Sequence, residues 1–266
     1  METIDIGISG MLLMYGLLLV PLGIFYVYGI GLWRDTLVSV LRMTVQLVLV
    51  GLYLKYIFEL NSLWIICLWI IVMLLVANWN VLEKARLRCW TFFPYTLIGI
   101  TVGTLAITAY FVFLVLRPTP FYDARYLIPI TGMILGNCLR GNVISLERFY
   151  SGIKKNEKEF ITYLMMGAGL AEAVRPYLRD ALQAAISPML ATVATMGLVS
   201  LPGMMTGQIL GGAFPLVAIK YQIAIMICIF TVMTASALLN ITLSLKIAFN
   251  EYHILKENVF PESFGK

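Results

Sequence analysis

Long unbroken apolar runs constrain this sequence more than any other feature. Seven stretches are each near the length of about 20 residues that a helix needs to cross the hydrocarbon core of a bilayer. Strands of a membrane β-barrel alternate apolar and polar side chains, and these runs do not. We therefore predict an all-α, polytopic membrane protein with about seven transmembrane helices. The predicted spans are Ile8–Tyr28, Leu37–Ile57, Leu63–Trp79, Phe92–Leu116, Tyr126–Ser145, Ser187–Gly211 and Pro215–Leu245.

Composition supports this class and excludes others. Apolar residues make up 61% of the 266 residues and charged residues only 12%, whereas soluble domains carry about 25% charged residues. The four cysteines are far apart in the sequence, and no Walker A, GxSxG or HExxH pattern is present, so no metal, redox or hydrolytic site is readable. We expect no catalytic residues, no cofactor bound by this chain, and a multi-pass location in the plasma (cytoplasmic or inner) membrane, with the lipid bilayer as its surroundings.

The distribution of basic residues predicts the orientation. If the N-terminus lies outside, 15 of the 19 Lys and Arg residues fall in the loops and tail that lie inside. Positive charge accumulates on the cytoplasmic side of membrane proteins. The sequence therefore predicts an N-out, C-in topology, and the net charge of +5 reflects that topology rather than binding to nucleic acid.

Intramembrane acids and histidines are missing from the predicted spans. None of the 14 acidic residues lies in the middle of a span, and the one histidine, His253, lies in the C-terminal tail. A proton-driven transporter usually keeps such a group in the membrane as a relay, so that class is disfavoured. Sodium coupling through backbone carbonyls stays open. A retinal pump is also disfavoured, because Lys220 and Lys246 lie at the ends of the last span.

Residues 147–186 form the longest hydrophilic stretch and predict a cytoplasmic coupling segment between spans five and six. A charged helix, Ser151–Phe160, precedes the small residues Gly167–Gly169, which permit a tight turn. An amphipathic helix then places its apolar side chains on one face: Ala171, Val174, Leu178, Leu182 and Ala185. A helix–turn–helix of this kind either docks a soluble partner or lies at the membrane interface. The candidate contact residues are Met165, Met166, Gly167, Ala168, Gly169, Glu172, Arg175 and Arg179.

The sixth predicted span carries features typical of a transport pathway. Pro202 and Gly203 are expected to break or kink the helix, and interrupted helices often line the pathway of transporters. Gly203, Gly207 and Gly211 also have the spacing of a helix-packing motif. Polar side chains within spans either face the pathway or bond between helices. The candidate pathway residues are Arg42, Gln46, Asn78, Asn80, Asn137, Thr195, Ser200, Pro202, Gly203, Met204, Met205, Gln208 and Gln222.

The sequence alone names no metal site. Met204 and Met205 offer thioethers, but iron prefers harder oxygen and nitrogen donors, and filling of the core is the more common role of methionine. A chelated metal or an organic solute fits the candidate pathway residues as well as a free cation does.

Several stretches of the sequence are distinctive, most of all GLVSLPGMMTGQILGG at residues 197–212 and PLVAIKYQI at residues 215–223. Three more are LRMTVQLVLVGLYLKYIF at residues 41–58, ANWN at 77–80 and IPITGMILGN at 128–137. In their order along the chain, the five stretches resemble the FetB-like permeases of ABC transporters, a family linked to iron export. The resemblance covers about residues 37–247.

The resemblance implies one permease domain over residues 1–266 that works as a homodimer. It implies a separate cytosolic ABC ATPase that binds ATP and Mg²⁺ and drives alternating access through the coupling segment, with iron or another metal as the exported cargo. Plant relatives are linked to aluminium tolerance. Two alternatives stay open from the residues themselves: a partner-independent channel or sodium-coupled carrier of a small solute, and a membrane protein without transport activity.

Overall fold

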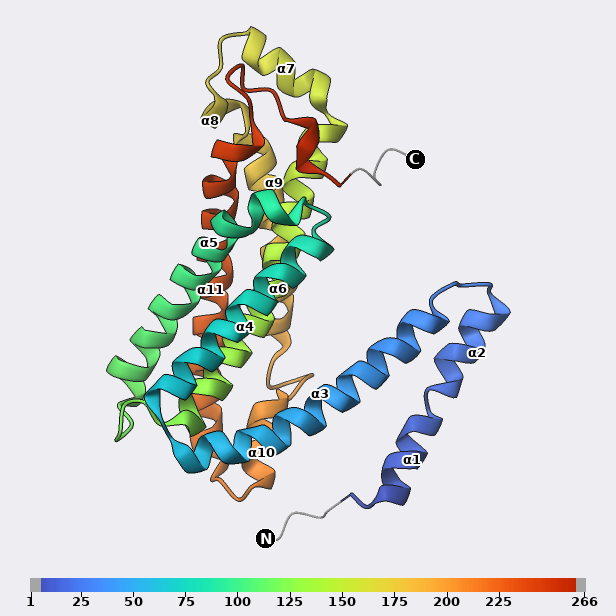
Figure 1. Cartoon of the computed structure of the whole chain (residues 1–266), viewed down its shortest axis with the longest axis vertical. Coiled ribbons are helices and arrows are strands. Elements are labelled where there is room, and N and C mark those ends of the chain that lie inside the picture. Colours follow the sequence, from blue (N-terminus) through green and yellow to red (C-terminus); the bar gives the residue numbers. More distant parts are fainter. Residues whose placement is uncertain (1–5, 262–266) are drawn as a thin grey trace.

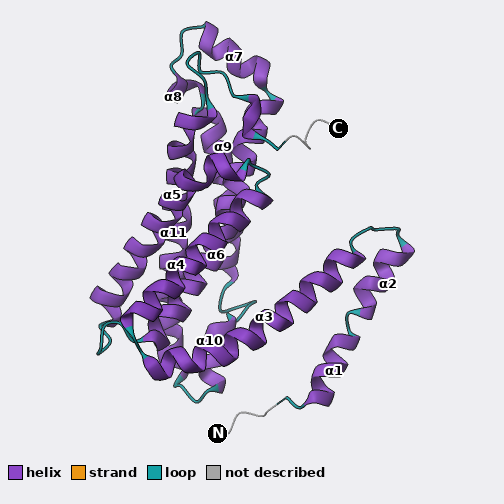
Figure 2. Cartoon of the chain, viewed as in Figure 1, coloured by secondary structure: helices purple, strands orange, loops and turns teal. Residues whose placement is uncertain are grey.

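The computed structural model describes residues 6–261, and it is built of helices (Figure 2). The ends of the predicted domain, residues 1–5 and 262–266, lie outside this range. The elements are α1 (Ile8–Gly16), α2 (Leu19–Val27), α3 (Trp33–Leu60), α4 (Leu63–Lys84), α5 (Cys89–Tyr110), the π-helix η1 (Phe111–Leu116), α6 (Ala124–Lys155), α7 (Glu157–Met165), α8 (Leu170–Ala173), α9 (Arg175–Thr195), α10 (Gly203–Leu210), α11 (Pro215–Ala248) and the 3₁₀ turn η2 (Glu257–Val259). The all-α prediction is confirmed.

Within residues 6–261, six helical stretches are long and apolar enough to cross a membrane, where the sequence predicted seven. The first comprises α1 and α2, which are separated at Leu17 and Leu18. Pro21 explains this interruption, because it has no N–H to donate to the carbonyl of Leu17. The predicted span Ser187–Gly211 is not one helix, since α9 ends at Thr195 and α10 begins at Gly203.

A bundle of α4, α5, α6, α9 and α11 forms the body of the molecule (Figure 1). α11 packs along both α5 and α6, and α9 packs against α6. The largest fully buried side chains include Phe92, Phe149 and Tyr150, whose rings meet edge to face around Tyr150. Close van der Waals packing of such side chains holds the helices together, because lipid surrounds apolar side chains as favourably as a neighbouring helix does.

Two polar side chains set where α3 ends and α6 begins. Asn61 adopts the left-handed conformation that closes a helix (φ 37°). Its Oδ1 accepts a hydrogen bond from the backbone N–H of Ala124 at 3.0 Å. Asp123 caps α6 by accepting from the N–H of Arg125 at 2.9 Å. The bond between Asn61 and Ala124 joins residues that are 63 positions apart in the sequence, whereas the Asp123 cap is local.

Helices α1, α2 and α3 form an arm that stands away from the bundle (Figure 1). None of the residues in their most apolar windows is buried within the chain. Within the arm, the hydroxyl groups of Tyr15 and Thr44 share a hydrogen bond of 2.6 Å. The apolar surface of the arm therefore faces lipid or another chain.

Three of the four regions predicted to lie inside gather at one end of the bundle: the turn after α4, the region of α7 and α8, and the C-terminal segment; the loop between α2 and α3 lies on the separate arm (Figure 1). The turn after α4 and the C-terminal segment meet there, because the N–H of Arg88 donates to the carbonyl of Val259 at 3.0 Å. Phe160 of α7 stacks near Phe249, with ring centroids 5.7 Å apart. This grouping agrees with a topology in which these segments share one side of the membrane.

A buried polar network links α6 to α11. Asn142 donates to Ser236 Oγ at 2.9 Å, and Asn240 donates to Asn142 Oδ1 at 2.6 Å. Gly99 of α5 lies directly against Asn240, so that a Cβ at this position would overlap the Asn240 side chain. None of Asn142, Ser236 and Asn240 was among the predicted residues, although polar side chains that bond between helices fix how membrane helices pair.

Removing the hydroxyl of Tyr150 is expected to destabilise the bundle modestly. Tyr150 is fully buried and donates to Ser244 Oγ at 2.7 Å. Tyr150→Phe keeps the ring contacts and loses this bond, which should cost about 0.5–1.5 kcal/mol. Thermal unfolding in detergent measures the change. Tyr252→Phe, at a side chain that is 79% exposed, should leave the unfolding temperature unchanged, and an equal drop in both variants would contradict the role of the bond.

Candidate functional site

The chain is interrupted between α9 and α10, inside an otherwise apolar region. Gly197 has φ +88°, which favours glycine, and its N–H donates to the carbonyl of Ser200 at 2.9 Å. Pro202 then caps the start of α10 in an extended conformation. The predicted break is present, but it begins at Met196, before the Pro202–Gly203 pair that suggested it. Seven residues of non-helical backbone therefore lie between the two helices.

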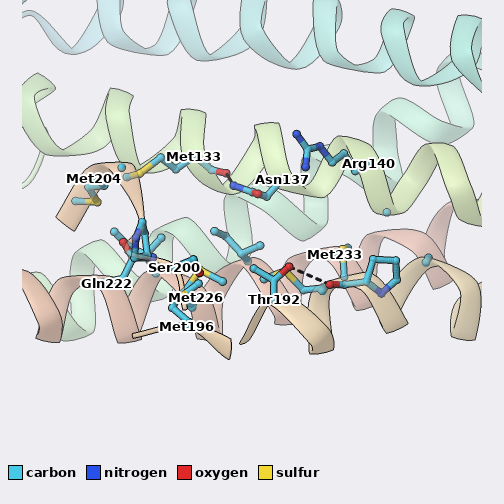
Figure 3. Close-up of a pocket in the computed structure, with 18 of the residues that line it drawn as sticks. Met133, Asn137, Arg140, Thr192, Met196, Ser200, Met204, Gln222, Met226 and Met233 are labelled. Atoms are coloured by element: carbon cyan, nitrogen blue, oxygen red, sulfur yellow. Dashed lines mark hydrogen bonds between the residues drawn. The ribbon is translucent and has the colours of Figure 1, made fainter. Parts of the chain in front are cut away.

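A cavity of about 400 Å³ opens beside this interruption, between α6, α9, α10 and α11 (Figure 3). Its polar lining comes from α6, α9, α11 and the interruption itself: Asn137, Arg140, Thr192, Ser200 and Gln222. A neighbouring apolar cavity of about 610 Å³ shares Met196, Pro202, Gln222 and Met226 with it. The interruption thus forms the wall between two hollows.

The structure brings six of the predicted pathway residues to the first cavity. These are Asn137, Ser200, Pro202, Gly203, Met204 and Gln222. Met205 lines the second, apolar cavity. The sequence therefore located part of this site through the polar residues and the proline–glycine pair.

The other predicted pathway residues lie elsewhere. Asn78 is buried between α4 and α5, where it donates to the carbonyl of Phe93 at 3.0 Å, which is the interhelical bond that the sequence offered as its alternative role. The remaining five line neither cavity: Arg42 and Gln46 are exposed on α3, Asn80 is half-buried on α4, Thr195 is exposed at the end of α9, and Gln208 is half-buried on α10.

The predicted glycine packing motif has no neighbour within the chain. A Cβ added at Gly203 or Gly207 would meet nothing within 4 Å. The close helix approach is instead found at Gly99 and Gly103, four residues apart on α5, which lie against Asn240 and Ser236. The spacing was the same, and only the packing distinguishes the two motifs.

Two polar side chains of the cavity form hydrogen bonds within their own helices, whereas the Gln222 side chain does not. Asn137 donates its amide to the carbonyl of Met133 at 2.8 Å, and Thr192 donates to Pro188 at 3.0 Å. Gln222 is 93% buried, and among the described residues its side-chain amide has no hydrogen-bond partner. Gln222 lines the cavity, so its amide is available to contact a ligand or water there.

Six methionines line the cavity, and the sequence did not identify them as a group. Only Met204 was a candidate; Met133, Met189, Met196, Met226 and Met233 join it from α6, α9, α11 and the interruption. Figure 3 shows Met133 and Met204 at one end of the lining, with Met196 and Met226 near Ser200. They are far apart in sequence and share no motif, so only the fold reveals the cluster.

The predicted coupling segment forms the far end of the molecule, where α7 lies (Figure 1). Met165 and Met166 are 76% and 80% exposed at the end of α7. Gly167 closes the turn with φ +89°, and Ala168 is half-buried. Gly169 caps the start of α8, and its N–H donates to Glu172 Oε2 at 3.1 Å. Arg175 and Arg179 are exposed on α9. The predicted tight turn is confirmed.

Two details of this segment differ from prediction. The charged helix expected over Ser151–Phe160 begins inside α6, which continues to Lys155 before the chain bends at Asn156. On α9 the buried residues are Tyr177, Ala181 and Ala185, because Tyr177 packs on Phe160 and turns this face toward α7. Val174, just before α9, is buried too, whereas Ala171 is exposed. Nearby, Tyr163 donates to Glu159 Oε1 at 2.7 Å, and this bond raises the pKa of the phenol.

Hard-metal chemistry has no candidate site in the part of the chain that the structure describes. No group of three or more His, Cys, Asp and Glu side chains comes together among residues 6–261. The first cavity contains no carboxylate, and Arg140 is its one charged residue.

These features define a class. The chain is a multi-pass α-helical membrane protein with an interrupted helix beside an internal cavity. It belongs to the Uncharacterised protein family (UPF0014), whose pattern matches residues 8–249. This membership confirms the resemblance found in the sequence and agrees with a multi-pass location in the inner membrane.

Alignments with three relatives each cover most of the chain. The chain is 31% identical to the Probable iron export permease protein FetB of Escherichia coli over 229 residues. This alignment covers 85% of the chain and 86% of that protein. The chain is 33% identical over 241 residues to Protein ALUMINUM SENSITIVE 3 of Arabidopsis thaliana, covering 88% and 85%. It is 34% identical over 225 residues to the UPF0014 membrane protein slr1647 of Synechocystis, covering 85% and 87%. No solved structure matches the chain.

Proposed function

We propose that this chain is the membrane-spanning permease subunit of an ATP-driven ABC exporter that moves iron or another metal by alternating access. The observation that carries the proposal is the cavity at the interruption between α9 and α10. Interrupted helices in membrane transporters free backbone groups and hinge points beside the substrate. The relative named as an iron export permease supports the cargo class.

The tip formed by α7, the Gly167 turn and α8 is proposed as the surface that docks a cytosolic ATPase. Met165 and Met166 expose large apolar side chains there. Their exposure at the end of a hydrophilic segment fits apolar anchors for a soluble partner. α9 then runs from this tip to the cavity, so a push on the tip moves one wall of the cavity. ATP and Mg²⁺ belong to the partner, since the sequence has no P-loop.

The functional unit is proposed to be a homodimer. Arg42 and Gln46 are exposed on α3, and among the described residues neither has a hydrogen-bond or ion-pair partner. Polar side chains in a membrane span usually face a protein interior or water. A second copy packed on α3 would supply that surrounding. This subunit carries no catalytic residues in the proposal, and hydrolysis occurs on the ATPase.

Blocking the tip is expected to uncouple the chain from its ATPase. Gly167→Arg puts a large cation into a turn whose φ of +89° disfavours any side chain. In affinity purification from native membranes followed by mass spectrometry, a P-loop ATPase should accompany the unaltered chain and be reduced at least about tenfold in the variant, which corresponds to about 1.4 kcal/mol of binding free energy.

Gly212→Arg is the matched control. Gly212 has φ +92° with open space around it, as Gly167 has, and it lies after α10 at the opposite end of the molecule (Figure 1). It should retain the ATPase. If the unaltered chain brings down no ATPase and carries solute alone in liposomes, the chain is a partner-independent channel or sodium-coupled carrier, and the proposal is wrong.

A further inference from the structure

The methionine lining of the first cavity is chemically distinctive. Six thioethers from α6, α9, α10, α11 and the interruption converge on a space of about 400 Å³. Five of them are half-buried: Met133, Met189, Met196, Met204 and Met226. All but Met196 also pack against the buried cluster around Ile225 and Ile229, so they line the cavity from its apolar wall. Met233 is buried against Gly141 and serves packing.

The remaining groups of the cavity narrow the choice of ligand. The oxygen donors are neutral amides and hydroxyls from Asn137, Thr192, Ser200 and Gln222. Divalent and trivalent hard cations favour carboxylates, which this lining lacks. Soft thioether ligands instead select cations such as Cu(I). Arg140 lies at the end of the lining away from Met204 and Gln222 (Figure 3), so its charge is separated from the opposite end of the methionine group.

We infer that this cavity binds a soft monovalent cation of the Cu(I) and Ag(I) class, with Met196, Met204 and Met226 as its thioether ligands and the Gln222 amide beside them. The three methionines come from the interruption, α10 and α11, so the cation joins the two sides of the broken helix to α11. That this cation is the exported cargo rests on the proposed function. The inference specifies the cargo as a soft monovalent cation rather than iron.

Silver(I) alone is the probe, because it is stable in air and has a filled d shell, as Cu(I) has. The full-length chain is purified in detergent in chloride-free buffer. Cys67→Ala and Cys89→Ala form the background, since these two thiols are accessible or partly so and would bind silver themselves. Equilibrium dialysis with elemental analysis then gives the stoichiometry and affinity for Ag⁺, with Fe²⁺ and Zn²⁺ as competitors.

The test variant is Met196→Leu/Met204→Leu/Met226→Leu, which removes three sulfurs and nearly keeps the volume. The matched control is Met11→Leu/Met14→Leu/Met43→Leu, three exposed methionines of the arm that lie outside both the cavity and the proposed docking tip. We expect one tightly bound Ag⁺ per chain in the background protein and in the control. The affinity of the test variant should fall at least about tenfold, with an unchanged thermal unfolding temperature. X-ray absorption of the Cu(I)-loaded chain should show sulfur neighbours that the test variant loses.

Three results would overturn the inference: equal Ag⁺ affinity in the test variant and the background, an equal loss in the matched control, or Fe²⁺ binding in this cavity as tight as that of Ag⁺. Silver bound at the buried Cys228 would give the first of these. Binding is measured on the chain without its ATPase, and the ATPase purification needs no metal. If silver does not bind in the cavity but the ATPase complex is intact, only the inferred cargo class is wrong. If silver binds but no ATPase accompanies the chain, only the proposed function is wrong.

Discussion

Gly99→Leu is expected to prevent the bundle from closing. Gly99 of α5 lies against Asn240 of α11, and even a Cβ would overlap the Asn240 side chain. Leucine would push the two helices apart and separate Asn240 from Asn142, to which it donates at 2.6 Å. Overpacking alone costs about 1–3 kcal/mol, and the stranded amides add about 1–3 kcal/mol. Against a total stability of about 5–15 kcal/mol, we expect a large loss of folded protein.

Yield in membranes and thermal unfolding in detergent measure this effect. Gly136→Leu is the control, because Gly136 is also helical but exposed, with nothing within 4 Å of a Cβ. It should unfold near the temperature of the unaltered chain. If Gly99→Leu behaves like Gly136→Leu, the close approach of α5 and α11 is incorrect.

Gly203→Trp is expected to abolish transport without unfolding the protein. Gly203 is the first residue of α10 and lines the cavity, and a Cβ there would meet open space. The indole ring would occupy much of a cavity of about 400 Å³. A ligand that competes with a covalently attached side chain loses its site, so metal efflux by cells should fall more than about tenfold, equivalent to about 1.4 kcal/mol.

Gly207→Trp one turn later distinguishes cavity filling from damage to α10. Gly207 has the same open surroundings but does not line the first cavity. Efflux should persist in this variant, and both proteins should unfold at similar temperatures. Equal efflux in the two variants would show that the cavity is not on the transport path.

Sequence reasoning found the helices because membrane spans are encoded locally. About 20 apolar residues predict a span wherever they occur, and α3, α4 and α11 lie close to their predicted ranges. The interruption after α9 was located only approximately, since Pro202 and Gly203 are visible in the sequence while the turn at Gly197 depends on its bond to Ser200. The predicted boundary therefore failed where a local backbone turn, rather than composition, ends the helix.

The site was predicted in part for a different reason. Asn137, Ser200 and Gln222 stood out as polar residues in apolar spans, and they do line the cavity. Asn78 carried the same signal and is a packing residue. Methionine in a span carries no signal, so Met133 and Met226 were missed. Polarity marks a residue that needs a partner, and only the fold says whether that partner is a neighbouring helix or a ligand.

The arm described above also makes the protein responsive to bilayer thickness. α3 has 28 residues, which at about 1.5 Å each gives about 42 Å, whereas the hydrocarbon core is about 30 Å thick. A helix longer than the membrane tilts to fit it, and within one copy of the chain the bundle does not oppose this tilt, because the apolar window of α3 is not buried against it. Thinner membranes should therefore increase the slope of α3 first, while the packed helices keep their angles.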